Sequence, residues 1–444
     1  MACLIKIKIL FFISIILLPA SLSALEVVEV KSPGGIKAYL SEDHSNPLIA
    51  LSIQFRGGSS SDSTRKIGIS QMVSGLLDEG AGEFDSFSFR SKLENLSIRL
   101  SFDSSVDFFS GQMETLTENA EEAFNLLSLS LKSPRFDAEP IERIRRQILV
   151  SILRESESPN RIASKVMFSK LFPEHPYGFP RNGTKKTINN ITREDLVNFV
   201  NTRFAKDRLI IGVAGDITPE ELEKVLDKTF GFLPDTLSSD WLKESVKPKF
   251  FGTVVIDKDI PQSTLYLAKE GISRNNKDWY AALLANHIFG GGSFTSRLMK
   301  EVRVKNGLAY SVSSALFPFV ASDLLVASAG TRNTSAKKSL EIIIDEWSKF
   351  GASGPTDFEV QEAKKYLKGS WPLRFTSTQS IARTLVSIQR DNLGINYIKL
   401  RNNYIDSVNL QDIRRVAKDL YDINKLSIVV VGKPEGIENK EYDG

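Results

Sequence analysis

The amino-acid sequence predicts an α+β protein built from two homologous layered α/β domains, in which strands pack with helices. Two observations lead to this fold class. Residues 191–215 and 408–432 each run from a capped helix, through a short break, into a β-branched strand that ends in Gly. The strand expected after Pro47 also has a counterpart after Pro261, 214 residues later. A repeat of this length is too long for a solenoid and indicates a duplicated domain.

The two copies of the repeated segment share their helix start. Thr192 and Asn409 are the expected N-cap residues, with Asp195 and Asp412 as their capping-box partners three residues later. The β-branched strands that follow lack strict alternation of apolar and polar residues, so we expect both of their faces to be buried. These strands are expected at 209–214 and 426–431.

The domain boundaries follow from the repeat and from composition. We expect a signal peptide at 1–24, an N-terminal domain at 25–235, a linker at 236–249 and a C-terminal domain at 250–444. The linker region, LPDTLSSDWLKESVKPKF, contains two Pro and many polar residues, which is typical of a connection between domains.

The overall composition excludes several classes of protein. Lys and Arg number 57 against 54 Asp and Glu, a formal net charge of +3, so there is no electrostatic sign of a nucleic-acid-binding protein. The chain has one Cys, which cannot form an intramolecular disulfide or a Cys-rich metal site.

The first 24 residues have the three-part pattern of a cleaved secretory signal. Lys6 and Lys8 precede the apolar run Ile9–Leu18, and Pro19 and small residues up to Ala24 follow. The apolar run is too short to span a bilayer, which takes about 20 residues, although an uncleaved anchor is the alternative. We therefore expect export to a bacterial periplasm and no membrane association after cleavage.

Four segments carry a resemblance to a known family. They are GISQMVSGLLDEGA from Gly68, LFPEHPYGFPRNGT from Leu171, VAGDITPEEL from Val213 and FGGGSFTSRLMKEVRVKNGLAYSVSS from Phe289. With the two-domain architecture, these segments resemble the pitrilysin/insulinase family of zinc metallopeptidases, most closely its short-chain branch related to mitochondrial processing peptidase. The resemblance covers nearly the whole chain after the signal.

The resemblance also implies that the metal site has been lost. Active members carry His-x-x-Glu-His on the helix after the first strand, two zinc ligands and a general base on one helical face, and a later Glu completes the ligands. Here the helix expected between Gly68 and Gly80 places Gln71, Ser74 and Gly75 at those positions, and the later ligand position falls on Ser151. We expect no metal in this chain.

The three His of the chain do not supply another metal site. His44, His175 and His287 lie in separate segments and share no ligand-like spacing. We interpret each as a structural residue.

The substrate side of the family's site is retained. The resemblance implies that Arg303 and Tyr310 contact a substrate carbonyl and stabilise an oxyanion in a partner's site, as N–H and O–H donors can. An ordinary ion pair for Arg303 and a core position for Tyr310 are the alternative. Gly290, Gly291 and Gly292 precede this region in an expected loop; without a following Gly-Lys-Ser/Thr it is no phosphate loop, and we expect it to approach a peptide closely.

Two functions remain open. The first is an exported non-catalytic subunit of a heteromeric zinc metallopeptidase that degrades or processes peptides. Its partner would be a homologous subunit carrying His-x-x-Glu-His and the zinc. The second is a periplasmic scaffold or peptide-binding protein of the same family without a proteolytic role. An independent hydrolase is not indicated, because the sequence has no G-x-S-x-G elbow or other visible nucleophile.

Overall fold

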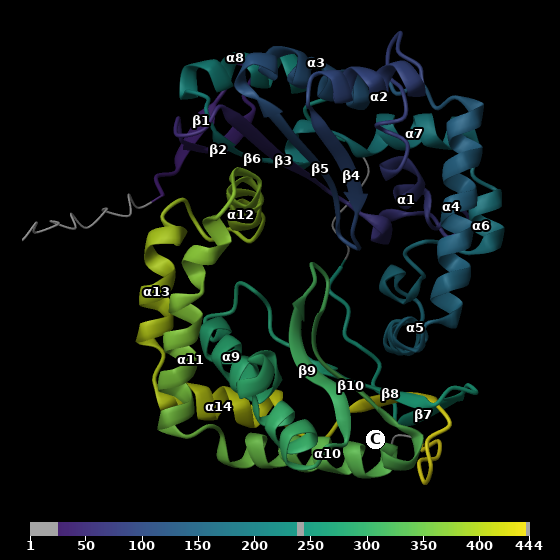
Figure 1. Ribbon diagram of the computed structural model, residues 1–444, viewed down its shortest axis with the longest axis vertical. Helices are drawn as coiled ribbons and strands as arrows, with labels where there is room; N and C mark the ends of the chain where they lie inside the picture. Colours follow the sequence, from purple (N-terminus) through teal and green to yellow (C-terminus); the bar gives the residue numbers. More distant parts are fainter. Residues whose placement is uncertain (1–24, 238–243, 441–444) are drawn as a thin grey trace, which may run out of the picture.

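The computed structural model describes residues 25–237 and 244–440 (Figure 1). The predicted signal peptide at 1–24 and the part of the predicted linker at 238–243 lie outside the described residues. Figure 1 shows two halves, each built around one β-sheet, with helices along the outside of each sheet.

The first half holds a six-stranded sheet in the order β1-β2-β6-β3-β5-β4. Its strands are β1 Val28–Lys31, β2 Lys37–Glu42, β3 Leu48–Arg56, β4 Arg99–Ser104, β5 Phe108–Leu116 and β6 Leu209–Gly215. The second half holds a five-stranded sheet in the order β7-β11-β8-β10-β9. Its strands are β7 Thr253–Asp257, β8 Gln262–Glu270, β9 Ala309–Pro318, β10 Asp323–Arg332 and β11 Ser427–Gly432.

The two sheets have the same topology once β1 is set aside. The parallel pair β2 and β6 corresponds to the parallel pair β7 and β11, and every other pairing in both sheets is antiparallel. The predicted fold class, two homologous layered domains, is therefore confirmed.

Helices surround both sheets. Those of the first half are α1 Ile69–Ser74, α2 Ser86–Asn95, α3 Ala120–Lys132, α4 Ala138–Glu157, α5 Pro159–Leu171, α6 Lys185–Asn189, α7 Arg193–Arg203 and α8 Pro219–Phe230. Those of the second half are α9 Trp279–Asn286, α10 Ala336–Ser353, α11 Asp357–Gly369, α12 Thr378–Arg390, α13 Tyr397–Ser407 and α14 Leu410–Leu420. Among the described residues, no helix has the length and apolarity that crossing a membrane requires.

The predicted helix starts and strands of the repeat are confirmed. Thr192 caps α7 and Asn409 caps α14, and in both cases the backbone N–H of the cap residue donates to the carboxylate three residues later, Asp195 or Asp412. Strands β6 and β11 are buried over nearly their whole length, as their unbroken apolar character predicted.

Both faces of these strands are buried because the two halves exchange a helix. Helix α12 of the second half packs on β6 and β3 of the first, and α5 of the first half packs on β11 and β8 of the second. In the first contact Ala214 lies in one cluster with Ile381 and Leu385. In the second, Met167 lies in one cluster with Val429. Each half thus covers the sheet of the other, which joins them through apolar surface.

A buried polar contact also joins the halves at their turns. Asp107, in the β4–β5 turn, accepts hydrogen bonds from the Tyr177 hydroxyl at 2.8 Å and from the backbone N–H of Val320 at 3.0 Å. The Tyr177 oxygen in turn accepts from the backbone N–H of Ala321 at 2.8 Å. Burial raises the pKa of Asp107 despite these donors.

Candidate functional site

Helix α1 begins at a buried carboxylate. Asp62 accepts hydrogen bonds from the backbone N–H groups of Gly68 at 3.1 Å and Ser70 at 3.3 Å, and also from the Ser70 hydroxyl. Gly68 has a φ of 95°, so only a residue without a Cβ enters the helix there without strain. Burial raises the pKa of Asp62 to about 6.

Helix α1 is shorter than the sequence predicted. It ends at Ser74 and is followed by turns, whereas a helix between Gly68 and Gly80 was expected. Gly75 is a poor helix former, and the Ser74 hydroxyl donates to the Gln71 carbonyl at 2.9 Å, which competes with the backbone hydrogen bonds of the helix. The turn after the helix is tighter than an α-helical turn, since Leu76 and Leu77 both donate their backbone N–H to the Val73 carbonyl.

The four positions where the resemblance implied lost metal ligands and a lost general base lie on α1, at its C-cap Gly75 and on α4. The Gln71 amide is 3.5 Å from the Ser74 hydroxyl, and its Oε1 is buried without a hydrogen bond. A Cβ on Gly75 would lie 3.2 Å from Cγ2 of Ile144 on α4. Ser151 follows Ile144 by seven residues, two helical turns, so the two residues share a face of α4.

Each His of the described chain takes part in a local contact of its own. His44 lies between Asp216 at 2.5 Å and Glu42 at 2.7 Å, and these hydrogen bonds raise its pKa. His175 accepts from the Tyr177 backbone N–H at 3.2 Å. His287 stacks on Tyr366, and burial lowers its pKa.

Arg303 and Tyr310 lie together on the surface of the second half. The Arg303 guanidinium carbon is 5.1 Å from the centre of the Tyr310 ring, and Tyr310 is 78% exposed. Within the described part of the chain no carboxylate pairs with Arg303. The alternative, an ordinary ion pair for Arg303 and a core position for Tyr310, is therefore not what the structure shows.

These two residues and α1 lie in opposite halves. Helix α1 packs against β4, α4 and α7 of the first half, while the strand that begins with Ala309 and Tyr310 belongs to the second sheet (Figure 1). The structure therefore brings Arg303 and Tyr310 together but does not bring them to Gln71, Ser74 and Gly75 of the same chain.

The three Gly of the expected loop are largely helical. Residues His287–Gly291 form a π-helical turn, so the expectation of a loop was wrong here. A Cβ on Gly290 would lie 2.4 Å from the Ser314 hydroxyl on β9, and one on Gly292 would lie 2.7 Å from the His287 carbonyl. Close packing of this turn on β9 accounts for Gly290, and a peptide is not needed to explain it. Gly291 is exposed.

Phe294 was not among the residues predicted for the site. This residue is 60% exposed, and its ring centre lies 5.0 Å from the Arg303 guanidinium carbon. Its only signal was an aromatic residue two positions after the Gly run. Nothing in that spacing indicated exposure or contact with a residue nine positions later.

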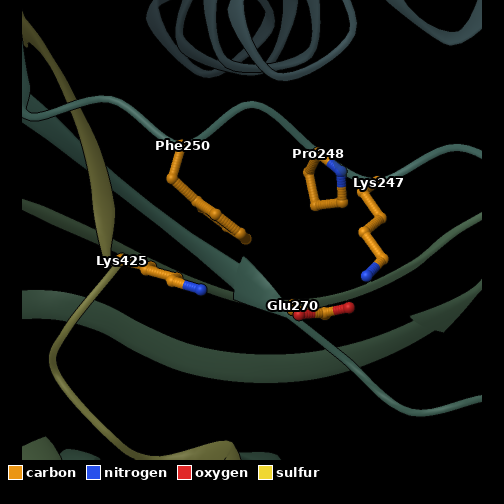
Figure 2. A pocket seen from close by; sticks show the side chains of 5 residues that line it. All are labelled: Lys247, Pro248, Phe250, Glu270 and Lys425. Atoms are coloured by element: carbon orange, nitrogen blue, oxygen red, sulfur yellow. The ribbon is translucent and has the colours of Figure 1, made fainter. Parts of the chain in front are cut away.

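A cavity of about 220 Å³ lies elsewhere in the second half. Figure 2 shows that it is lined by Lys247, Pro248, Phe250, Glu270 and Lys425. Its charged side chains are exposed and carry both signs. Glu270 on β8 pairs with Leu324 at the start of β10. Ala309, the residue before Tyr310 on β9, pairs with Thr331 near the end of β10. The cavity and Tyr310 therefore lie at opposite ends of the sheet.

Comparison with known proteins identifies the family. Residues 37–185 match the model for insulinase, peptidase family M16, and residues 190–367 match the model for the peptidase M16 inactive domain. The chain is 30% identical over 336 residues to the probable mitochondrial-processing peptidase subunit beta of Schizosaccharomyces pombe, covering 71% of both chains. The chain belongs to the insulinase family.

Other members of the insulinase family are similar over most of the chain. The non-peptidase homolog YmxG of Helicobacter pylori is 28% identical over 393 residues, 88% of this chain and 90% of that protein. A solved peptidase M16 inactive domain from Pseudomonas fluorescens has a TM-score of 0.87 at 26% identity, covering 94% of this chain and all of that one. A protease structure from Helicobacter pylori, 17% identical, shares the fold with a TM-score of 0.83, covering 92% of this chain and all of that one.

The residues at the zinc positions implied by the insulinase family do not fit a zinc ion. Gln71, Ser74 and Ser151 offer an amide and two hydroxyls where zinc takes imidazole, thiolate or carboxylate. Gly75 offers no side chain, and Ile144 crowds the space that one would enter. Throughout 25–237 and 244–440, no group of three His, Cys, Asp or Glu is placed to hold a metal ion.

Proposed function

We propose that this chain is an exported, non-catalytic subunit of a heteromeric zinc metallopeptidase that processes or degrades peptides. In this proposal Arg303 and Tyr310 act in the zinc site of a partner subunit. One observation carries the proposal: the expected metal positions on α1 and α4 carry no ligand chemistry, while on the other half Tyr310 stands exposed in contact with the half-buried Arg303. A chain that only supports an assembly has no evident need for that pair.

The partner is a homologous subunit that carries His-x-x-Glu-His and binds the zinc, and this chain binds none. Zinc bound there would polarise a peptide carbonyl and activate water. The residues of this chain bind and orient the peptide. The Arg303 guanidinium and the Tyr310 hydroxyl donate hydrogen bonds to a carbonyl oxygen, and those bonds strengthen as negative charge develops on it.

The relatives support a subunit of this kind. Some carry the name mitochondrial-processing peptidase subunit beta, and the Helicobacter pylori relative is named a non-peptidase homolog. The charged n-region, short apolar run and small residues of 1–24 support export to a bacterial periplasm.

Co-expression with a homologous chain that carries His-x-x-Glu-His tests the proposal. We expect the two chains to co-purify and to cleave peptides. Arg303→Gln should lower kcat/KM of the pair about 100-fold without changing its assembly, because one donor to the developing charge is lost. Arg181→Gln, at an exposed position of the first half, is the matched control.

Two results would count against the proposal. Unchanged turnover in Arg303→Gln would show that Arg303 is not part of the peptidase site. A stable assembly without peptidase activity would instead favour the scaffold function.

A further inference from the structure

Phe294 has a position that folding stability does not explain. Its ring is 60% exposed. Burial of such a ring would stabilise the fold, and here most of that contribution is absent. The residue lies in the short 3-10 turn Ser293–Thr295, between the π-helical turn with the Gly residues and the segment that carries Arg303.

The turn that presents Phe294 is held in a strained conformation. Ser293 has a φ of 51°, in the left-handed region that non-Gly residues seldom adopt. Two side-chain hydrogen bonds hold it there: the Thr295 hydroxyl donates to the Gly292 carbonyl and the Ser296 hydroxyl to the Ser293 carbonyl, both at 2.8 Å. Strain of this kind persists where the surrounding contacts fix the backbone, and it is common at functional sites.

The guanidinium of Arg303 bridges two exposed rings. Its carbon lies 5.0 Å from the centre of the Phe294 ring and 5.1 Å from the centre of the Tyr310 ring. A guanidinium that lies over aromatic rings keeps its N–H groups available in its own plane. The nearby acid Glu301 pairs with Lys305, and no ion pair joins it to Arg303 in the described part of the chain.

We propose that Phe294 is a positioning residue that acts through Arg303. Its ring holds the guanidinium between itself and Tyr310, so that the N–H edge faces outward toward a planar oxygen acceptor of an extended peptide. The acceptor is a backbone carbonyl or a C-terminal carboxylate, which share this geometry. The inference rests on the proposed role of Arg303 in peptide binding.

Steady-state kinetics of the chain paired with its zinc-binding partner test the role of Phe294. Phe294→Ala and Phe294→Leu should raise KM about 3-fold to 30-fold, the range expected for loss of one cation–π contact. Phe294→Tyr keeps the ring and should restore KM. Phe87→Ala is the matched control, since Phe87 is 80% exposed on α2 and makes no contact with Arg303. Circular dichroism verifies that each variant folds.

A direct binding measurement identifies the acceptor. Fluorescence anisotropy of a labelled unstructured peptide is followed with the isolated chain and with the pair, using the peptide with a free and with an amidated C-terminus. Equal affinity for the two forms assigns a backbone carbonyl as the acceptor. Weaker binding of the amidated form assigns the carboxylate. In either case Phe294→Ala should weaken binding and Phe294→Tyr should not.

Several outcomes would overturn the inference. Wild-type behaviour of Phe294→Ala beside a loss in Arg303→Gln would reject Phe294 and leave the proposed function standing. Failure of Phe294→Tyr to restore binding would show that the ring is not what matters, and absence of any peptide binding would reject the inference outright. Peptide binding that depends on Phe294, in a chain that forms no zinc peptidase with any partner, would reject the proposed function alone.

Discussion

Gly75 packs closely against Ile144, at one of the positions where the resemblance implied a metal ligand. A Cβ on Gly75 would lie 3.2 Å from Cγ2 of Ile144, closer than an ordinary van der Waals contact. The packing of α1 on α4 therefore leaves little room for a larger side chain at position 75.

Gly75→His should accordingly destabilise the chain by about 2 kcal/mol, because the added side chain overpacks against Ile144. In an Ile144→Ala background, the destabilisation caused by Gly75→His should be smaller by about 1 kcal/mol or more, since the two sites are in contact. Urea unfolding of the four proteins in this double-mutant cycle measures both values. Strictly additive effects would show that Ile144 does not block the position.

Tyr310→Phe separates binding chemistry from folding. Since the side chain is 78% exposed, removal of its hydroxyl should change the free energy of unfolding by less than about 0.5 kcal/mol. Turnover by the pair with the zinc-binding partner should fall about 100-fold, as for other donors to a developing oxyanion. Thermal unfolding and steady-state kinetics measure the two effects. Normal turnover would mean that the hydroxyl makes no contact with the reacting peptide.

Gly212→Val tests the helix exchange between the halves. A Cβ at Gly212 of β6 would lie 2.4 Å from the backbone carbonyl of Ala382 on α12, so the helix could not keep its place. We expect a loss of about 3 kcal/mol in unfolding free energy. The control is Gly369→Ala, where a Cβ has open space and should leave stability unchanged or raise it by up to about 1 kcal/mol. Equal stability of the two variants would contradict the close contact.

The buried carboxyl of Asp62 should make stability depend on pH. Burial raises its pKa to about 6, against about 3.9 in an unfolded chain, although the Arg203 guanidinium lies 4.0 Å away. Between these values the folded chain binds more protons than the unfolded chain, so the contribution of Asp62 to stability falls as pH rises. The side chain is fully ionised and least favourable above the folded pKa.

Asp62→Asn removes this titration. Relative to wild type, the variant should gain stability as pH rises from about 4 to about 7, by on the order of 2 kcal/mol. Urea unfolding of both proteins across this range measures the difference, and comparison of the two cancels the other titrating groups. A difference that stays constant with pH would show that Asp62 keeps an ordinary pKa.

Much of the fold could be predicted because its signals are local. The capping residues Thr192 and Asn409 and the β-branched strands at 209–214 and 426–431 are determined by neighbouring residues, and the structure confirms them. Burial of both strand faces was also predicted. Which helix covers each second face was not, because the α5 and α12 exchange depends on contacts between residues far apart in the sequence, such as Ala214 with Leu385 and Met167 with Val429.

The candidate site, too, was predicted only in part. Arg303 and Tyr310 were found from a motif, and their contact agrees with that interpretation without testing their role. Phe294 was missed because its exposure depends on the positive φ of Ser293 and on a π-helical turn, which single-sequence patterns do not reveal. The early end of α1 was missed because the hydrogen bond from Ser74 to Gln71 adds to the weak helix propensity of Gly75.

The zinc content and peptidase activity of the separate chains and of the reconstituted pair test the central claim most directly. We expect one equivalent of zinc in the partner, none in this chain, and peptide cleavage only when Arg303 and Tyr310 are supplied to the partner's site. Stoichiometric zinc in this chain alone, or zinc-dependent cleavage by it without a partner, would contradict the account.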